Sequence, residues 1–118
     1  MNNKQKGDYG ENVVLGYLAA KGYKILAKNY KKSGGEIDII AKDGGYIVFI
    51  EVKYRRGRKF GTGFDAVAGS GQHKRIIKTA KAYLLENNKW EADCRFDIIE
   101  VFGHEELEIE HMENAFWE

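Results

Sequence analysis

Proline is absent from this 118-residue sequence, and cysteine occurs only once, at Cys94. Without proline, the 14 glycines supply the breaks between segments. A lone cysteine excludes an internal disulfide and is typical of a reducing compartment. The sequence also lacks an apolar run of the roughly 20 residues that a membrane-spanning helix needs, and its start shows no signal-peptide pattern. We therefore expect a cytoplasmic protein that makes no contact with a membrane.

Nothing in the sequence divides the chain into parts. No linker, internal repeat or low-complexity tract stands out, and 118 residues suffice for one hydrophobic core but not for two. An aromatic content of 13% argues against disorder over most of the chain. We therefore predict one domain over residues 1–118, with a disordered polar tail at residues 1–7.

The net charge of +1 hides a strong asymmetry along the chain. Residues 52–81 contain nine Lys and Arg against one acid, Asp65, whereas residues 82–118 contain two Lys and Arg against eleven acids. The basic segment is suited to hold a phosphate backbone. It is also compatible with a solvated surface, or with an acidic tail that folds over and neutralises it.

The most informative stretch runs from Glu36 to Lys53 and is typical of two strands joined by a tight turn. Asp43-Gly44-Gly45 supplies the positive φ that hairpin turns need. The second strand is apolar on both faces as far as residue 50, which predicts a central strand covered on both sides. Glu51 and Lys53 share one face of that strand, and the hairpin brings Asp38 to the same end of the sheet.

Two carboxylates and an amine at the end of a core strand need an explanation, because burying a charge is costly unless a partner compensates for it. A divalent metal site is one explanation: Asp38 and Glu51 would ligate Mg²⁺ or Mn²⁺, with the carbonyl of Val52 as a further oxygen. Lys53 would then orient the attacking water or offset the charge that builds on a phosphate. The alternative is a solvated ion pair of Lys53 with Glu51 or Asp38.

The remaining periodicities predict two helices and three more strands. An amphipathic helix over residues 8–20 has Asp8 as its N-cap, and a helix over residues 72–87 carries lysines on its polar side. Strands are expected at residues 23–30, 95–102 and 107–111, the last as a half-exposed edge strand. Together with the hairpin these give the order helix, strand, strand, strand, helix, strand, strand. This is an α/β arrangement whose helices can cover both faces of a mixed sheet.

Candidate nucleic-acid contacts come from the basic loop after the hairpin and from the polar side of the second helix. The glycine-rich loop over residues 54–63 suits backbone contacts to phosphates, although it lacks the Gly-Lys-Ser/Thr ending of a P-loop. The lysines of the helix are either a track for a phosphate backbone or an ordinary solvated face. The candidate basic residues are Arg55, Arg56, Arg58, Lys59, Lys74 and Lys78.

The roles of several other residues are also predicted from the sequence, and one of them, Glu11, has two interpretations. Glu11 is either a first-turn acid favoured by the helix dipole or a further carboxylate facing the metal site. Asp97 is expected to be structural. The histidines at positions 73, 104 and 111 lack zinc-ligand spacing and are expected on the surface. Residues 31–35 are expected to form a basic mobile loop, and Phe116 and Trp117 to anchor the end of the chain.

Two segments of the hairpin, 35–41 (GEIDIIA) and 48–53 (VFIEVK), resemble the PD-(D/E)xK nuclease signature. A wider pattern, which includes Gly10-Glu11 and residues 22–26, 95–98 and 113–116, is similar to the YraN family of small bacterial proteins and to archaeal Holliday-junction resolvases. The resemblance extends from residue 10 to residue 116 and so covers nearly the whole chain.

This resemblance implies a restriction-endonuclease-like fold, with a central mixed sheet flanked by helices, and a nuclease site that uses Mg²⁺ or Mn²⁺. On this match Asp38 and Glu51 fall on the metal-ligand positions and Lys53 on the catalytic lysine. Glu11 falls on the helix glutamate of the resolvase-like branch. The family usually has a lysine near the start of the second long helix, where Gln72 stands nearest in this chain, so substrate contacts from this helix are less firmly expected.

The sequence therefore predicts a metal-dependent endonuclease that hydrolyses phosphodiester bonds in DNA, with branched DNA as one candidate substrate. Two alternatives stay open: a nucleic-acid-binding protein whose site does not turn over, and a protein-interaction module whose acidic tail docks on a basic partner. A four-way junction needs two cuts, so a homodimer with twofold symmetry is expected if that is the substrate.

Overall fold

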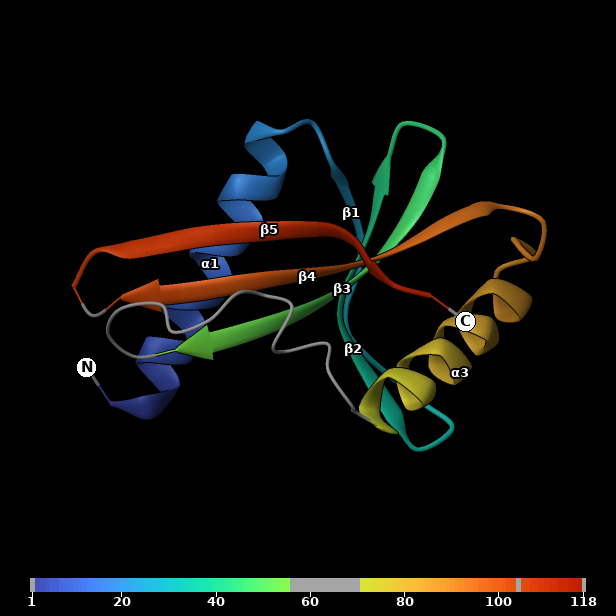
Figure 1. Ribbon diagram of the computed structural model, residues 1–118, viewed down its shortest axis with the longest axis horizontal. Helices are drawn as coiled ribbons and strands as arrows, with labels where there is room; N and C mark the ends of the chain where they lie inside the picture. The colour runs from blue at the N-terminus through green and yellow to red at the C-terminus, as the bar shows by residue number, and fades with distance from the viewer. Residues whose placement is uncertain (1, 56–70, 104, 118) are drawn as a thin grey trace.

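The computed structural model describes residues 2–55, 71–103 and 105–117. In these ranges a five-stranded sheet is flanked by two helices, which is an α/β arrangement (Figure 1). The order along the chain agrees with the predicted one. The elements are α1 (Asn3–Ala20), β1 (Lys24–Lys32), β2 (Gly35–Asp43), β3 (Tyr46–Arg55), α3 (Gly71–Glu86), β4 (Asp93–Gly103) and β5 (Leu107–Phe116).

The strands follow one another across the sheet in the order β1-β2-β3-β4-β5, so β3 is central as predicted. Neighbouring strands run antiparallel except for β3 and β4, which run parallel from the pair Tyr46 and Asp93 to the pair Arg55 and Phe102. A parallel pair needs a long crossover connection, and α3 lies in that connection. The crossover thus leads from the end of β3, where the predicted site lies, to the start of β4 by way of α3.

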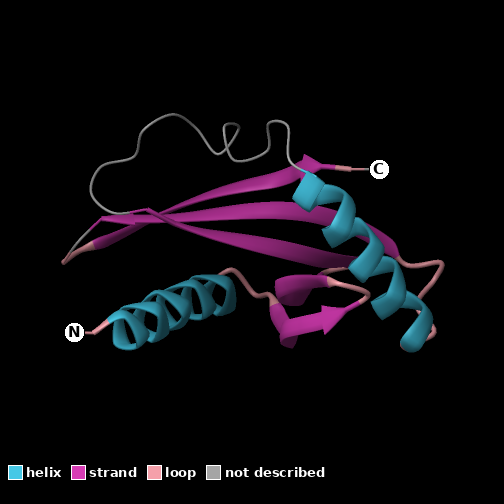
Figure 2. Ribbon diagram, turned by 90° about the horizontal axis from the view of Figure 1, so that it is seen from below, coloured by secondary structure: helices cyan, strands magenta, loops and turns pink. Residues whose placement is uncertain are grey.

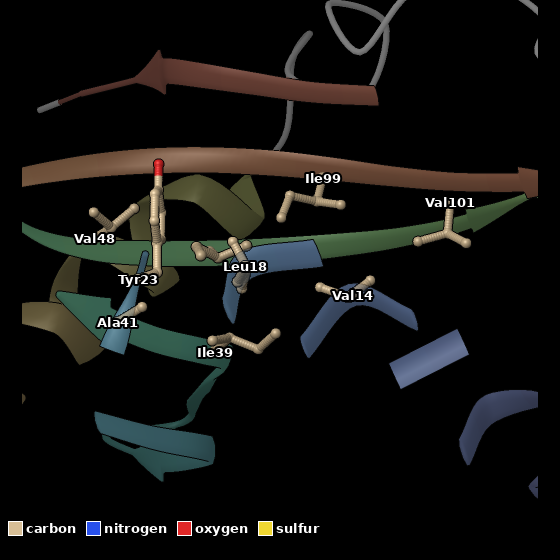
Figure 3. Close-up of a cluster of buried hydrophobic side chains, with 9 residues drawn as sticks. Val14, Leu18, Tyr23, Ile39, Ala41, Val48, Ile99 and Val101 are labelled. Atoms are coloured by element: carbon tan, nitrogen blue, oxygen red, sulfur yellow. The ribbon is translucent and has the colours of Figure 1, made fainter. Parts of the chain in front are cut away.

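The sheet divides the core into two clusters. On one face, Val14 and Leu18 of α1 pack on buried side chains of β2, β3 and β4 (Figure 3). On the other face, Ile76 and Leu84 of α3 pack on a cluster that includes Phe49 of β3. Figure 2 shows α1 beneath one end of the long strands and α3 at the opposite end. Each fully buried side chain of this size contributes about 1.5–3 kcal/mol, so the two helices hold both faces of β3 closed.

The hairpin turns at the two ends of β2 contain two residues each. Gly44 has φ +57 in the turn predicted at Asp43-Gly44-Gly45, and Asp43 pairs with Tyr46 across it. The turn between β1 and β2 consists of Ser33 and Gly34, which have φ +56 and +81, the signature of a type I′ turn. The expected mobile loop over residues 31–35 is therefore wrong, because pairing of the two strands continues up to this turn.

Helix α1 begins earlier than predicted, at Asn3 rather than at Asp8. The side chain of Asn2 accepts a hydrogen bond of 2.8 Å from the backbone N–H of Gln5, whose own side chain accepts one of 2.9 Å from the N–H of Asn2. This capping box satisfies two backbone donors that a helix start leaves unpaired. Residues 3–7 are thus helical, which differs from the polar tail expected there.

The end of the described chain is anchored by one aromatic residue rather than by two. Phe116 is buried and belongs to the cluster beneath α3, whereas Trp117 is 71% exposed. Strand β5 reaches Phe116, beyond the predicted end at residue 111. No helix in the described ranges is both long enough and apolar enough to cross a membrane.

The contact between the β1–β2 hairpin and α3 requires a glycine, which gives a first prediction. A Cβ at Gly35 would lie 3.0 Å from the carbonyl oxygen of Arg75 and still closer to Oγ1 of Thr79. We expect Gly35→Ala to lower the free energy of unfolding by about 1–3 kcal/mol, because helix and hairpin must move apart. Urea denaturation measures this.

The matched control is Gly16→Ala in α1, where no atom lies within 4 Å of the added carbon. There the free energy of unfolding should rise by about 0.5–1 kcal/mol, because alanine favours the helix over glycine. Equal effects of the two substitutions would contradict the close packing inferred at Gly35.

Candidate active site

The hairpin of β2 and β3 opens at the end where the predicted site lies. Backbone pairing of the two strands runs from Asp43 and Tyr46 to Ile39 and Ile50 and stops there. One residue further along β2, the side chain of Asp38 takes over, because its Oδ2 accepts a hydrogen bond of 2.8 Å from the N–H of Val52. The carboxylate thus satisfies a backbone donor that would otherwise lack a partner. Because the two strands separate here, space is left beside Asp38.

Glu51 and Lys53 lie on the same face of β3, as predicted, and they contact each other. Nζ of Lys53 is 2.8 Å from Oε1 of Glu51, and the two side chains are 30% and 4% exposed. This contact is an ion pair, and neither Glu51 oxygen accepts a hydrogen bond from a described residue. The ion pair of Lys53 with Glu51, considered as the alternative to a metal site, is therefore present, but its Glu51 side chain is buried rather than solvated.

Two small hollows meet at Asp38. The larger, of about 190 Å³, lies on the α3 side of the sheet and has Glu51 in its wall; the smaller, of about 100 Å³, lies toward α1. Asp38 borders both, so its carboxylate is accessible from either side of the open hairpin. The larger hollow is also lined by Gly34, Gly35, Glu36, Gln72, Arg75 and Ile76, and the smaller by Glu11, Asn29, Ile39, Val52 and Tyr54.

The surroundings of Asp38 disfavour its charged form. Burial raises the pKa of Asp38, and the neighbouring carboxylates of Glu36 and Glu51 raise the pKa further. The hydrogen bond from Val52 and the charge of Lys53 act in the opposite direction but do not cancel the rise. A cation placed beside Asp38 would favour the charged form of its carboxylate.

Glu11 lies where a carboxylate facing the site is expected. Because α1 begins at Asn3, Glu11 sits in the interior of the helix, and the interpretation as a first-turn acid is wrong. Its side chain lines the smaller hollow together with Asp38 and forms an ion pair of 3.4 Å with Lys28 of β1. The preceding residue, Gly10, is covered so closely by the ring of Tyr54 that a Cβ would lie 2.5 Å from it.

Of the residues predicted to contact nucleic acid, one lines the larger hollow, three lie elsewhere, and three lie outside the described residues. Gln72 lines the larger hollow, and its Oε1 is 3.5 Å from Nζ of Lys53. Lys74 and Lys78 are exposed but lie on the opposite side of α3, two and six residues from Gln72 at about 100° per residue. Nε of Arg55 is 2.7 Å from Oε2 of the buried Glu100. The remaining candidates, Arg56, Arg58 and Lys59, lie outside the described residues, as does His104.

Three residues near the site were not found from the sequence. Arg75 lines the larger hollow, Tyr54 lines the smaller one, and His73 places Nε2 3.5 Å from Oε2 of Glu51. His73 is buried and stacks on Phe116 at 4.1 Å between ring centroids, so its expected surface position is wrong. Arg75 and His73 lie beside the apolar stripe of α3 in the sequence. Their position next to this stripe could have indicated that they lie close to the sheet.

The donor set fits a divalent cation of the Mg²⁺ type. Asp38 and Glu51 offer hard carboxylate oxygens at one hollow, and those of Glu51 are buried without a hydrogen bond from a described residue. Mg²⁺ is commonly held by one or two carboxylates while it keeps several waters, which a hollow of about 190 Å³ can contain. The third predicted ligand is the carbonyl of Val52. The N–H of the same residue donates the hydrogen bond to Asp38, so Val52 lies next to this carboxylate.

The family model described as "Uncharacterised protein family UPF0102" matches residues 10–101 of the chain. The chain belongs to this family. A UPF0102 protein of Clostridioides difficile is 49% identical over 116 residues, which cover 98% of this chain and 100% of the relative. Another, from Thermodesulfovibrio yellowstonii, is 46% identical over 111 residues and covers 94% of this chain and 95% of the relative.

The UPF0102 match begins in α1 and ends in β4, so it contains Glu11, Asp38, Glu51 and Lys53. It agrees with the family resemblance read from the sequence at the level of the YraN-like family. The wider nuclease superfamily stays a prediction.

A second group of acids in this UPF0102 chain is satisfied internally. Asp97 of β4 is fully buried, and its carboxylate accepts hydrogen bonds from both Nε and Nη2 of Arg95 and from the N–H of Asn114. His111 places Nε2 2.7 Å from the same carboxylate and is buried, so its expected surface position is also wrong. The structural role expected for Asp97 agrees with these contacts.

Asp97, His111 and Glu113 could in principle ligate a metal ion together. However, Nη2 of Arg95 already lies 3.0 Å from Asp97 and 3.4 Å from Glu113, and it donates a hydrogen bond of 2.6 Å to the hydroxyl of Tyr23. The guanidinium supplies the positive charge that a metal ion would bring. We therefore assign this group to stability rather than to metal binding.

A second prediction concerns acid stability. Burial raises the pKa of Asp97, but hydrogen bonds from His111, Arg95 and Asn114 outweigh burial and lower the pKa below its ordinary value. This stabilisation is present above the pKa of the unfolded chain, about 4, and is lost as the pH falls through the lower folded value. We expect Asp97→Asn to cost about 3–5 kcal/mol at pH 7 and to flatten the decline of the unfolding free energy below pH 4.

Asp93→Asn, at an exposed position of the same strand, is the control and should leave both quantities nearly unchanged. Denaturant titrations at several pH values measure the unfolding free energy. An Asp97→Asn protein with the full acid dependence of the wild type would contradict this assignment.

Proposed function

We propose that this protein is a divalent-metal-dependent nuclease with a restriction-endonuclease-like fold, which hydrolyses phosphodiester bonds in DNA. The observation that carries the proposal is the pair of Asp38 and Glu51 at one hollow, with the buried oxygens of Glu51 lacking hydrogen bonds from described residues and with Lys53 at 2.8 Å. The resemblance to the PD-(D/E)xK signature and the mixed sheet with a helix on each face support the proposal.

Asp38 and Glu51 would hold the cation, and Glu11 lies close enough to Asp38 to assist from the smaller hollow. When bound, a divalent cation supplies Lewis-acid activation of water and neutralises charge on the phosphate. The same carboxylates would repel a phosphodiester in the absence of a cation, because like charges at short range disfavour one another. Cation binding and substrate binding are therefore expected to be coupled.

Lys53 has the position of a group that stabilises developing charge. Its ammonium is held between Glu51 and Gln72, and 30% of the side chain is exposed, so it can reach both the hollow and solvent. Such a donor can hold the attacking water or the phosphate oxygens in line with the bond that breaks. Its contact with Glu51 fixes the amine beside the cation-binding carboxylates.

Nucleic acid is the proposed substrate class because of the charge distribution. Residues 52–81, which include Lys53 and the start of α3, have nine basic residues and one acid. Such a segment supplies the salt-dependent attraction that non-specific nucleic-acid binding requires. The start of α3 also lies beside the larger hollow, because Gln72 and Arg75 line its wall.

A cleavage panel gives the third prediction. Labelled linear, nicked, flapped and four-way DNA should be cut with Mg²⁺ or Mn²⁺ and not with EDTA. Asp38→Asn, Glu51→Gln and Lys53→Met should each lower the cleavage rate by at least about 100-fold. The control is Glu91→Gln, which removes one exposed negative charge after the end of α3 and should cut at the wild-type rate.

Retained cleavage in the Asp38→Asn and Glu51→Gln proteins would refute the proposed site. Salt-sensitive binding of DNA without cleavage under all conditions would instead favour a binding protein, and no binding at low salt would favour a protein-interaction module.

Thermal unfolding gives a fourth prediction. Because the folded-state pKa of Asp38 is raised, its ionised form costs stability, and this cost is complete once the pH exceeds that pKa. In EDTA at neutral pH, Asp38→Asn should therefore melt at a higher temperature than the wild type. Mn²⁺ should raise the melting temperature of the wild type and leave that of Asp38→Asn unchanged, because only the wild type gains binding free energy.

Glu91→Gln should respond to Mn²⁺ as the wild type does. An equal response of Asp38→Asn and wild type to Mn²⁺ would place the cation elsewhere.

A further inference from the structure

The larger hollow contains a cationic side chain that the sequence did not single out. Arg75 lies on α3 one turn after Gln72, and both residues line the wall shared with Asp38 and Glu51. Ile76, the neighbour of Arg75, lines the same hollow and is buried beneath the helix. This side of α3 therefore faces the site, while Lys74 and Lys78 face away from it.

We propose that Arg75 binds a backbone phosphate of the nucleic acid at the larger hollow, an inference that rests on the proposed function. In this arrangement Arg75, rather than Lys74 or Lys78, is the residue of α3 that positions the phosphate beside Asp38 and Glu51. A guanidinium suits this role because its planar array of N–H donors can bind two phosphate oxygens at once.

The backbone of Arg75 is held in place by the β1–β2 hairpin. Oγ1 of Thr79 lies 2.9 Å from the carbonyl oxygen of Arg75 and 3.0 Å from that of Lys32, and it is placed to donate to both. Thr79 is fully buried, and Gly35 of the hairpin packs against both residues so closely that no Cβ would fit. The strand that carries Asp38 begins at Gly35, so the distance between Arg75 and the acids is set by rigid elements.

The side chain of Arg75 is also available. It is exposed, and no ion pair or hydrogen bond joins its guanidinium to another described residue. Lys53 is engaged by Glu51, and the nearby Glu36 is paired with Lys31 at 3.4 Å. A cationic group at the rim of a polar hollow, without a partner among the described residues, is suited to an anionic ligand.

The charges at this hollow favour a phosphate once a cation is bound. Glu36 and Glu51 are each paired with a lysine, which leaves the carboxylate of Asp38 and the guanidinium of Arg75 as the other charges of the lining. A divalent cation beside Asp38 would make the hollow positive, and Arg75 adds one further positive charge to the attraction for a phosphate.

The test compares Arg75→Gln with Lys74→Gln, which removes the same charge from the adjacent residue on the other side of the helix. Binding of a labelled DNA duplex is measured by fluorescence anisotropy in Mg²⁺ over a series of salt concentrations, with cleavage followed in parallel. Arg75→Gln should weaken binding about tenfold or more and reduce the slope of log K against log salt by about 1. Lys74→Gln should change the binding constant by less than about threefold, and Arg75→Lys should recover only part of the loss.

A duplex with one neutral methylphosphonate next to the cleaved bond identifies the contact itself. If Arg75 binds that phosphate, the neutral group should weaken binding to the wild type but not weaken binding to Arg75→Gln any further. A merely structural role of Arg75 would leave the two losses additive. Thermal melting of each variant shows that the comparison is made between folded proteins.

Equal binding by Arg75→Gln and Lys74→Gln, or additive losses with every neutral phosphate placed around the cleaved bond, would overturn the proposal while leaving the nuclease function intact. A wild-type protein that neither binds nor cuts any DNA of the panel would overturn both.

Discussion

The hydrogen bond from the N–H of Val52 to the carboxylate of Asp38 is the interaction on which the rest of the site depends. A β-hairpin normally satisfies its inner backbone groups by pairing along its full length. Here the pairing stops at Ile39 and Ile50, and the side chain replaces the missing backbone acceptor. The hairpin can therefore open without leaving a buried donor unsatisfied, and the opening holds both Asp38 and Glu51 at one hollow.

Asp97 performs a similar task in another part of the sheet, with a different result. The pairing of β4 with β5 shifts register between Phe96 and Ile98, and Asp97 accepts the N–H of Asn114 at this irregularity. Its other contacts, from Arg95 and His111, leave it neutralised and buried. Among the described residues, Asp38 has no hydrogen bond from a cationic side chain, and its pKa is raised instead. Each aspartate accepts a hydrogen bond from a backbone N–H where strand pairing is interrupted. The aspartate that is surrounded by cationic side chains stabilises the fold, and the other is a candidate ligand for a cation.

The hairpin, the central strand and the order of elements were predictable because they depend on local patterns. The turn at Gly44 and the apolar run of β3 identify their structures without reference to distant residues. The position of Asp38 next to Glu51 follows from the same hairpin. These contacts link residues that are separated by only one turn, so the sequence contains their spacing.

Several of the errors concern side chains whose partners lie far along the chain. His111 is buried against Asp97 and Tyr17, from β4 and α1, and nothing in its own neighbourhood indicates this. The choice between Arg75 and the lysines of α3 depends on how the helix is rotated over β2. That rotation is set by the close contact of Gly35 with Thr79, which joins segments 44 positions apart. An apolar stripe defines which side of a helix is buried, but not which of its two borders meets a neighbouring hollow.

The stack of His73 on Phe116 has a consequence for how the protein is handled. The ring of Phe116 packs on the imidazole of His73, whose Nε2 lies 3.5 Å from Oε2 of Glu51. Strand β5 therefore supports the position of Glu51 at the larger hollow through His73. Shortening the chain ahead of Phe116, or attaching a bulky fusion partner that pulls β5 away, would disturb Glu51 although the edit is remote from it in sequence. Purification tags for enzymatic work are therefore better joined to the other end of the polypeptide.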